Sequence, residues 1–311
     1  MSAKDVIVLN SHGIGQYAYC DHMPVWGESL SVKNWHIAED GGKGSNVAVA
    51  LGRLGVLTAY IGKVGYDPWG DLGEKWMRDA GVDVTYLYRS HEISTGTGLV
   101  LLGPDGQNTV IDGEGSSRAL TEEEILNALE AMKGSSWLVT GFEIPTHLAL
   151  FAAQYAKKLG MKTALNPSPL PKEGVGSLKY IDYLFINEVE GCYMCGKEKS
   201  AYVDPIQLTH EIRDLYGIQN IIMTMGDNGS IALCGNDIYY AKPVSVTNVV
   251  NTAGAGDGYM ASLIACLIKG MKIQKAMNWS SAYAALSITI NGTIPSYRYP
   301  EEVEAFIAEH E

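Results

Sequence analysis

The chain contains few cysteines, and their spacing excludes a disulfide scaffold. Its 311 residues include 5 cysteines, an odd number scattered along the sequence, which is not the pattern of a disulfide framework. Cys192 and Cys195 form a CxxC pair, but no second pair and no paired histidines accompany them. A tetrahedral zinc site therefore cannot be completed locally, and we expect a structural or incidental role for both thiols.

Basic residues and long apolar runs are also scarce. Lys and Arg number 23 against 35 Asp and Glu, which gives a formal net charge of −12. Nucleic-acid binding requires clustered basic side chains, so we expect no nucleic-acid partner. The apolar stretches are too short to span a bilayer, and residues 1–10 resemble a short strand more than a secretory signal. We therefore expect a cytoplasmic protein without a membrane partner.

A glycine-rich segment near the C-terminal end is the most informative feature. Residues 251–257 read NTAGAGD, and an apolar stretch without charge follows until Lys269. Glycines let backbone N–H groups approach an anion closely, and a helix N-terminus adds partial positive charge. A carboxylate there, such as Asp257, can act as a base toward a hydroxyl. The alternative is a turn that merely starts a buried helix, because short glycine motifs recur by chance.

Strand and helix patterns alternate along most of the chain. Apolar segments predict strands at 6–9, 58–63, 137–140, 163–165, 183–186 and 221–225, and helices are predicted at 44–54, 70–80, 121–132 and 146–159. Such alternation predicts an α/β fold with a mostly parallel sheet and helices on both faces. Ligands of such sheets bind beyond the carboxyl ends of the strands.

A second glycine cluster lies near the N-terminal end of the chain. Residues 40–46 read DGGKGSN and precede an Ala-rich helix. Together with NTAGAGD, this segment resembles the two signatures of the ribokinase (PfkB) family of carbohydrate kinases. Three segments between them, LNPSP at 165–169, NEVE at 187–190 and TMGDNG at 224–229, resemble further strand-end motifs in the family's order. The similarity runs from about residue 6 to residue 306.

The resemblance implies one ribokinase-like three-layer domain over residues 1–311, with a small β-sheet lid. The lid strands are expected within 16–39 and 96–112, the two stretches that break the alternation, with a turn at 103–106. Lids exclude water, which would otherwise compete for a phosphoryl group. In this family lids often pair, so the lid could also form a homodimer.

The resemblance further implies an ATP-dependent, Mg²⁺-requiring kinase of a small sugar or polyol. Asp257 would be the base toward a primary hydroxyl, and the N–H groups of Gly254, Ala255 and Gly256 would form the anion hole. Two alternatives stay open: a nucleoside kinase, and a catalytically silent regulator that binds a sugar or nucleotide.

The resemblance also assigns residues to each substrate. Asn187 and Glu190 would order Mg²⁺ and phosphate, with Glu190 reaching the metal through water. Their spacing equally fits a helix capping box, and both roles can hold at once. Nucleotide contacts are expected at Thr224, Gly226 and Gly229. On the sugar side they are expected at Gly41, Gly42, Asn46 and Glu143, with Lys43 near sugar or phosphate.

Two departures from the family pattern concern specificity and ions. The Asp that usually grips two sugar hydroxyls falls on Gly15, and its Asn neighbour falls on Gly13. The candidates to replace them are Asp40, His12, Gln16 and Asp21. Asn251 stands where the family usually has an Asp that helps to bind a monovalent cation, so a K⁺ requirement stays open.

Overall fold

The computed structural model describes residues 2–37, 39–103, 108–197 and 203–310. Its central sheet has nine strands within this part of the chain, in the order β13-β12-β11-β10-β9-β8-β1-β4-β5. The strands are β1 (Val6–Leu9), β4 (Thr58–Gly65), β5 (Asp83–Ser90), β8 (Trp137–Gly141), β9 (Lys162–Asn166), β10 (Tyr183–Asn187), β11 (Asn220–Thr224), β12 (Ser230–Cys234) and β13 (Asp237–Ala241). Strand β12 runs antiparallel to both of its neighbours, β11 and β13, and the other strand pairs described in this sheet are parallel.

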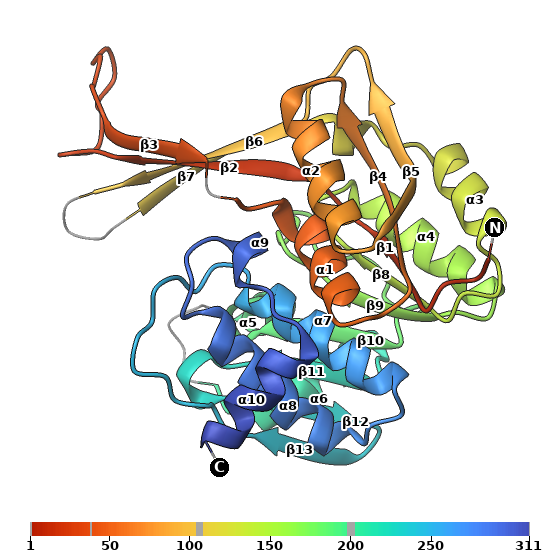
Figure 1. The fold of residues 1–311 in the computed structure, drawn as a ribbon. Coiled ribbons are helices and arrows are strands. Elements are labelled where there is room, and N and C mark those ends of the chain that lie inside the picture. Colours follow the sequence, from red (N-terminus) through yellow and green to blue (C-terminus); the bar gives the residue numbers. More distant parts are fainter. Residues whose placement is uncertain (1, 38, 104–107, 198–202, 311) are drawn as a thin grey trace.

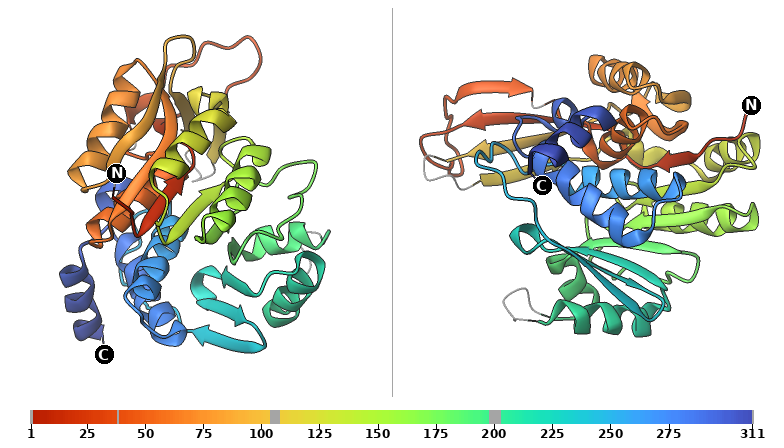
Figure 2. Two further views of the ribbon diagram at one scale, coloured as in Figure 1. Left: turned by 90° about the vertical axis from the view of Figure 1, so that its right-hand side faces the viewer. Right: turned by 60° about the horizontal axis from the view of Figure 1, so that its bottom comes forward.

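Helices cover both faces of this sheet, which confirms the predicted three-layer architecture (Figures 1 and 2). Side chains that alternate along β1 separate the two cores, because Val6 and Val8 face one layer and Ile7 and Leu9 the other. The first layer holds α1 (Gly42–Arg53), α2 (Pro68–Asp79), α7 (Ala255–Ile268), α8 (Ile273–Ser287) and α10 (Pro300–His310). The second holds α3 (Glu122–Ala131), α4 (Thr146–Lys158), α5 (Glu188–Met194) and α6 (Pro205–Tyr216).

The predicted strands and helices all appear, and the differences lie at their ends. Helix α1 begins at Gly42, two residues before the predicted start, so the glycine cluster is itself the first helical turn. Helix α2 begins at Pro68, because the side chain of Asp67 accepts hydrogen bonds from the N–H groups of Trp69 and Gly70. The antiparallel β12–β13 hairpin was not predicted.

A second, smaller sheet forms the lid. Its strand order is β3 (Lys33–Ile37), β2 (Gly13–Tyr19), β6 (Gly96–Leu102) and β7 (Asn108–Gly113). This sheet projects from the three-layer body (Figure 1). Strand β2 starts three residues before the predicted lid region, because its parallel pairing with β6 already begins at Gly13 and Gly96. Most of the predicted turn at 103–106 lies outside the described residues.

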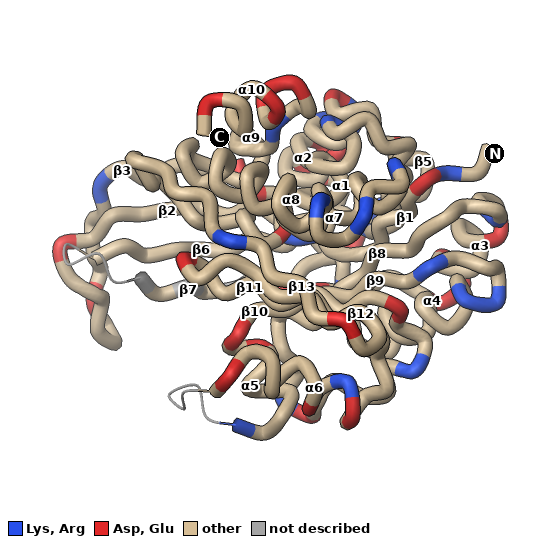
Figure 3. Tube along the Cα trace, turned by 90° about the horizontal axis from the view of Figure 1, so that it is seen from below, with Lys and Arg blue, Asp and Glu red and all other residues tan. Residues whose placement is uncertain are grey.

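The charged residues are dispersed over the molecule. In the described ranges, Lys and Arg are scattered among acidic residues and do not gather along one element (Figure 3). Several are paired, such as Arg89 with Asp71 at 2.7 Å. Among the helices of the described part, none combines the length and apolar character that a membrane crossing needs. The same residues contain no cluster of His, Cys, Asp and Glu suited to a metal ion.

Candidate active site

Polar groups from neighbouring parallel strands meet at one edge of the central sheet. Strands β1, β8, β9, β10 and β11 are adjacent, and each has a polar residue at its end or within the two residues that follow. Asn187 and Thr224, the last residues of β10 and β11, are direct partners in the pairing register. Glu143 follows the end of β8 by two residues. The sheet therefore brings the predicted motifs to the same edge, as parallel topology requires.

The NTAGAGD segment forms the N-terminus of α7. Gly254 caps this helix with a φ of 76°, and a Cβ there would lie 2.6 Å from the Tyr297 hydroxyl, so only glycine fits. Ala255 N–H donates to the Thr252 carbonyl at 3.3 Å. Among the described residues, no backbone carbonyl accepts from Gly254 or Gly256 N–H. Two of the three expected anion-hole donors are thus available to a ligand.

Asp257 lies in the first turn of α7 and is only 8% exposed. Asn46 Nδ2 donates to its Oδ2 at 3.0 Å, and Lys43 Nζ lies 3.6 Å from its Oδ1. Burial raises the pKa of Asp257, while the Lys43 charge and the Asn46 hydrogen bond oppose this shift. The negative charge of Asp257 in turn raises the pKa of Lys43. Lys43 is therefore a charged neighbour of Asp257.

Asn46 links Asp257 to the turn that precedes α1. Its Nδ2 also donates to Asp40 Oδ1 at 3.2 Å, and its Oδ1 accepts from Gly41 N at 3.3 Å and from Thr293 Oγ1 at 2.9 Å. Gly42 N donates to Asp40 Oδ1 at 3.2 Å. The donors that the resemblance assigns to sugar binding are engaged within the protein here, so their contact with sugar stays a prediction.

Glu143 is held against the start of α1. Its Oε2 accepts from Ser11 Oγ at 2.5 Å and from Lys43 N at 2.9 Å. Burial raises the pKa of Glu143 to about 7, against the opposing effects of the Lys43 charge and the Ser11 hydrogen bond. Ser11 carried no signal in the sequence beyond its place after the first strand.

A pocket of about 510 Å³ lies between the lid and the residues just described around the start of α1, which form its floor. Asp40, Gly42 and Glu143 line its floor side. The lid side includes four glycines that pair across β2 and β6: Gly13, Gly15, Gly96 and Gly98. Glu114 and Arg118, which form an ion pair at 2.8 Å, also line the pocket. No sequence motif marks Glu114 and Arg118, because they reach the pocket only through the tertiary fold of the segment after β7.

Of the four candidates to replace the missing Asp, Asp40 and His12 line this pocket, whereas Gln16 and Asp21 are not among its lining residues. Gln16 instead accepts from Trp35 Nε1 within the lid at 2.8 Å. Asp21 is exposed and lies 3.5 Å from Lys33 Nζ.

His12 is buried at the base of the lid. Its Nδ1 lies 2.7 Å from Ser45 Oγ on α1, and its Nε2 lies 3.1 Å from the carbonyl oxygen of Trp69 on α2. Burial lowers the pKa of His12 to about 4, so the ring is neutral at physiological pH. Because the carbonyl can only accept, Nε2 carries the proton and Nδ1 accepts from Ser45. Asp40 is therefore the better placed of the two to receive a sugar hydroxyl.

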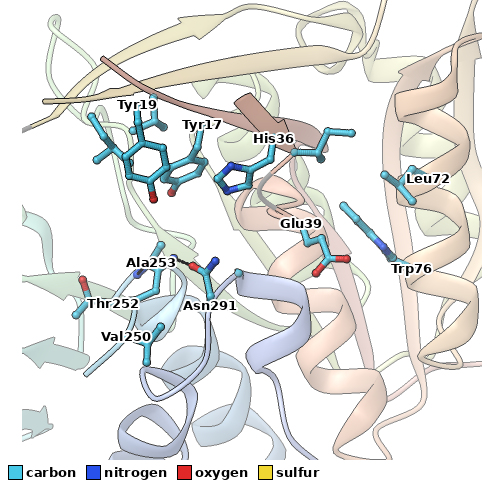
Figure 4. Close-up of a pocket in the computed structure, with 15 residues that line it drawn as sticks. Tyr17, Tyr19, His36, Glu39, Leu72, Trp76, Val250, Thr252, Ala253 and Asn291 are labelled. Atoms are coloured by element: carbon cyan, nitrogen blue, oxygen red, sulfur yellow. Dashed lines mark hydrogen bonds between the residues drawn. The ribbon is translucent and has the colours of Figure 1, made fainter. Parts of the chain in front are cut away.

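A second cavity of about 780 Å³ lies under the outer part of the lid (Figure 4). Tyr17, Tyr19 and His36 point into it from the lid, and the Tyr17 and His36 rings stack with centroids 5.8 Å apart. The opposite wall includes Thr252 and Asn291. This cavity could accommodate a planar ring.

Asn187 and Glu190, which the resemblance assigns to Mg²⁺ and phosphate, form a capping box at the start of α5. Asn187 Oδ1 accepts from Glu190 N at 2.8 Å, and Glu190 Oε2 accepts from Asn187 N at 2.9 Å. Burial raises the pKa of Glu190. Gly226 and Gly229 follow β11 with φ values of 54° and 83°, and a Cβ at Gly229 would lie 2.2 Å from the Ala241 carbonyl oxygen. At these two positions the loop after Thr224 presents backbone without a side chain.

Glu190 suits Mg²⁺, whereas the Asn251 side chain is a weaker ligand for a monovalent cation than the Asp that is usual in the family. One carboxylate, Glu190, suits Mg²⁺ held through water, because this ion takes few protein ligands when phosphates supply the others. At the expected cation position, Asn251 Oδ1 already accepts from Ala253 N at 2.9 Å. Its Nδ2 donates to Asn291 Oδ1 at 3.1 Å. The amide therefore offers a donor where a cation requires oxygen ligands.

Comparison with known proteins agrees with this geometry. The pfkB family carbohydrate kinase model matches residues 29–299, and the chain belongs to this family. A ribokinase of Staphylococcus aureus is 28% identical over 310 residues, covering 96% of this chain and 98% of that protein. A deoxyribokinase of Salmonella typhi is 27% identical, covering 99% and 100%. The structure of Arabidopsis thaliana ribokinase, complexed with ribose and ATP, has a TM-score of 0.87 at 25% identity and covers 98% of this chain and 99% of that one. The protein is a carbohydrate kinase.

The raised pKa of Glu143 predicts a pH-dependent effect of Glu143→Gln on stability. The native carboxyl titrates near pH 7 instead of its ordinary value of 4.5, so the folded state holds a proton that the unfolded state has released between these values. Wild-type stability therefore falls as pH rises through this window. We expect the Tm difference, Glu143→Gln minus wild type, to be about 2–4 °C larger at pH 8 than at pH 5. The exposed Glu173→Gln is the control. The same Tm difference for Glu143→Gln at both pH values would contradict the burial argument.

Proposed function

We propose that the protein transfers the γ-phosphoryl group of ATP to a primary hydroxyl of a small sugar or polyol, with Asp257 as the base. The observation that carries this proposal is the position of Asp257, a buried carboxylate beside the available N–H groups of Gly254 and Gly256 at the start of α7. The ribose and ATP bound in the Arabidopsis structure support both substrate classes.

The transfer follows from this arrangement. The acceptor hydroxyl oxygen forms a bond to the γ-phosphorus as its proton passes to Asp257, and the bond from that phosphorus to the bridging oxygen breaks to release ADP. Gly254 and Gly256 N–H groups and the α7 N-terminus stabilise negative charge on the transferring group. Lys43 favours the ionised form of Asp257 that can accept the proton.

The nucleotide would lie along the ends of β10 and β11. Thr224, Gly226 and Gly229 offer a side-chain-poor surface for its phosphates, and Glu190 with Asn187 would hold Mg²⁺ through water. The ion, when bound, neutralises phosphate charge during transfer. Asn187 would thus both cap α5 and lie beside the nucleotide phosphates.

Two alternatives differ in the acceptor or in catalysis. The stacked Tyr17 and His36 rings in the second cavity favour a nucleoside, whose base would lie there (Figure 4). A silent regulator would have no use for the charge pairing of Asp257 with Lys43.

A homodimer through the lid stays a prediction, supported by the exposed lid side chains of Trp26, Trp35 and Ile111. The cytoplasmic location also stays a prediction.

The role of Asp257 predicts the behaviour of Asp257→Asn. This variant should bind ATP normally and lose at least ~10²-fold in kcat, because it lacks the proton acceptor. Isothermal titration with ATP and steady-state turnover measure the two effects. The exposed Asp237→Asn, at the start of β13, is the matched control. Normal turnover of Asp257→Asn would remove Asp257 from the role of base.

The Asn251 amide pair predicts little activation by K⁺. Activity would be measured in Tris buffer with and without added KCl, at constant ionic strength maintained with a larger organic cation. We expect a weak response to K⁺ in the wild type. The response should be stronger in Asn251→Asp, which restores the negative charge at the expected cation site. Strong, saturable activation of the wild type at low K⁺ would contradict this prediction.

The glycine-lined pocket predicts that ribose is a poor acceptor. Without side chains at positions 13 and 15, hydroxyls far from the reacting one lose hydrogen-bond partners, and a larger acceptor gains space. We expect the best acceptor among pentoses, hexoses, ketohexoses and adenosine to exceed ribose in kcat/KM by at least about tenfold. The highest value for ribose would overturn this reading of the lid.

The variant Gly98→Ala tests the same pocket without disturbing the fold. A Cβ at Gly98 would meet only one atom within 4 Å, the Ile111 carbonyl oxygen at 3.9 Å. The methyl group would therefore take up space in the pocket without displacing neighbouring atoms. We expect the variant to raise the KM of the preferred, larger acceptor more than the KM of ribose.

A further inference from the structure

Three buried polar atoms near the base have no partner in the protein. Asn10 Oδ1, Thr140 Oγ1 and Asn166 Oδ1 are shielded from solvent, yet none has a hydrogen-bond partner among the described residues. Buried polar groups in folded proteins are almost always paired with protein or with ordered water. Three unpaired atoms in separate places would be three separate exceptions, but these three share one location.

All three residues line one small chamber beneath Lys43 and Asp257. They come from adjacent strands: Asn10 follows β1, Thr140 lies in β8, and Asn166 ends β9. In the sheet register, Thr140 pairs with Leu9, the neighbour of Asn10, and Gly141 pairs with Asn166. The chamber measures about 10 Å³, and apolar side chains close the rest of its wall: Val8, Val47, Val139 and Met260. That is the space of one water molecule.

The orientation of these groups suits a single hydrogen-bonding guest. Asn166 Nδ2 donates to the Phe185 carbonyl at 2.9 Å, which leaves Asn166 Oδ1 as the unpaired amide atom. The chamber thus contains two amide oxygens that only accept and one hydroxyl, that of Thr140, which can donate. Lys43, whose ammonium can donate three hydrogen bonds, lines the same chamber.

We propose that this chamber binds one water molecule, which positions Lys43 beside Asp257. The water donates its two hydrogens to Asn10 Oδ1 and Asn166 Oδ1, and it accepts from Thr140 Oγ1 and Lys43 Nζ. All four of its hydrogen-bonding positions are then used, and the three unpaired atoms are satisfied. A metal cation is disfavoured in this chamber, because the three unpaired side chains are neutral and the charge of Asp257, the one carboxylate that lines it, is already opposed by the Lys43 ammonium.

This site gives Lys43 a fixed place between two partners. The ammonium lies 3.6 Å from Asp257 Oδ1, longer than a direct hydrogen bond. A water below it would hold the ammonium there, so that Lys43 supplies charge to Asp257 without occupying the oxygen that receives the acceptor proton. Asn10, Thr140 and Asn166 are then positioning residues. Their effect on turnover rests on the proposed role of Asp257, whereas the presence of the water does not.

A crystal structure of the wild-type enzyme tests the chamber itself. We expect one isolated density peak within hydrogen-bond distance of Asn10 Oδ1, Thr140 Oγ1 and Asn166 Oδ1. Crystals soaked in RbCl separate water from a cation, because rubidium gives an anomalous signal. An empty chamber, or a rubidium peak in it, would overturn the proposal whatever the enzyme phosphorylates.

Steady-state kinetics test the positioning role. Thr140→Val keeps the side-chain shape and removes the hydroxyl, so kcat should fall by about 3- to 10-fold, the equivalent of one hydrogen bond. The KM values for ATP and acceptor should stay unchanged, and Thr140→Ser, which restores the hydroxyl, should recover kcat. Thr209→Val removes a similarly buried hydroxyl from α6 and should leave kcat unaltered.

The kinetic outcomes separate this role from a structural one. A water in the wild-type map together with normal kcat in Thr140→Val would refute the positioning role. Equal losses in Thr140→Val and Thr140→Ser would refute it too, because a hydroxyl is retained in the latter. If Thr140→Val does not fold, the wild-type map and Thr140→Ser still decide between these results.

Discussion

The placement of a carboxylate in the protein interior is the constraint on which the site depends. Asp257 loses most of its contact with water at the start of α7, and a buried charge is stable only with nearby compensation. Asn46 and Lys43, both on α1, provide it. The two glycine-rich segments, more than two hundred residues apart in sequence, therefore form one electrostatic unit. Neither helix start could shift far without exposing or isolating this charge.

The parallel sheet explains why so many polar groups serve one site. Its strands end along a common edge, and the loops that follow must leave the apolar layers there. Glu143, Asn187 and Thr224 occupy this edge because their strands are neighbours, although they are far apart in sequence. The hydrogen bonds of the capping box at Asn187 and Glu190 stabilise the start of α5 with the same side chains that the proposed function assigns to phosphate and Mg²⁺.

The sequence predicted most of the strands, several of the helices and the motif loops, because these follow from local periodicity and from glycine, but it did not predict the β12–β13 hairpin. It could not predict features that depend on contacts between distant segments. Arg118 and Glu114 reach the 510 Å³ pocket beside Glu143 only through the return of the chain after β7. The internal engagement of Asn46 depends on Thr293 from the far end of the chain. The early start of β2 at Gly13 likewise arises from pairing with β6, not from any strand propensity of glycine.

The histidine at the base of the lid has a mechanical consequence. His12 joins β1 to β2, and its neutral ring is held by α1 on one side and by α2 on the other. Gly73 lies so close to this ring that any side chain there would collide with it. The first residues of the lid are thereby clamped to two helices of the core. A displacement of the lid relative to α7 would therefore require β2 to bend beyond this clamp, because the residues that begin it are fixed to the core.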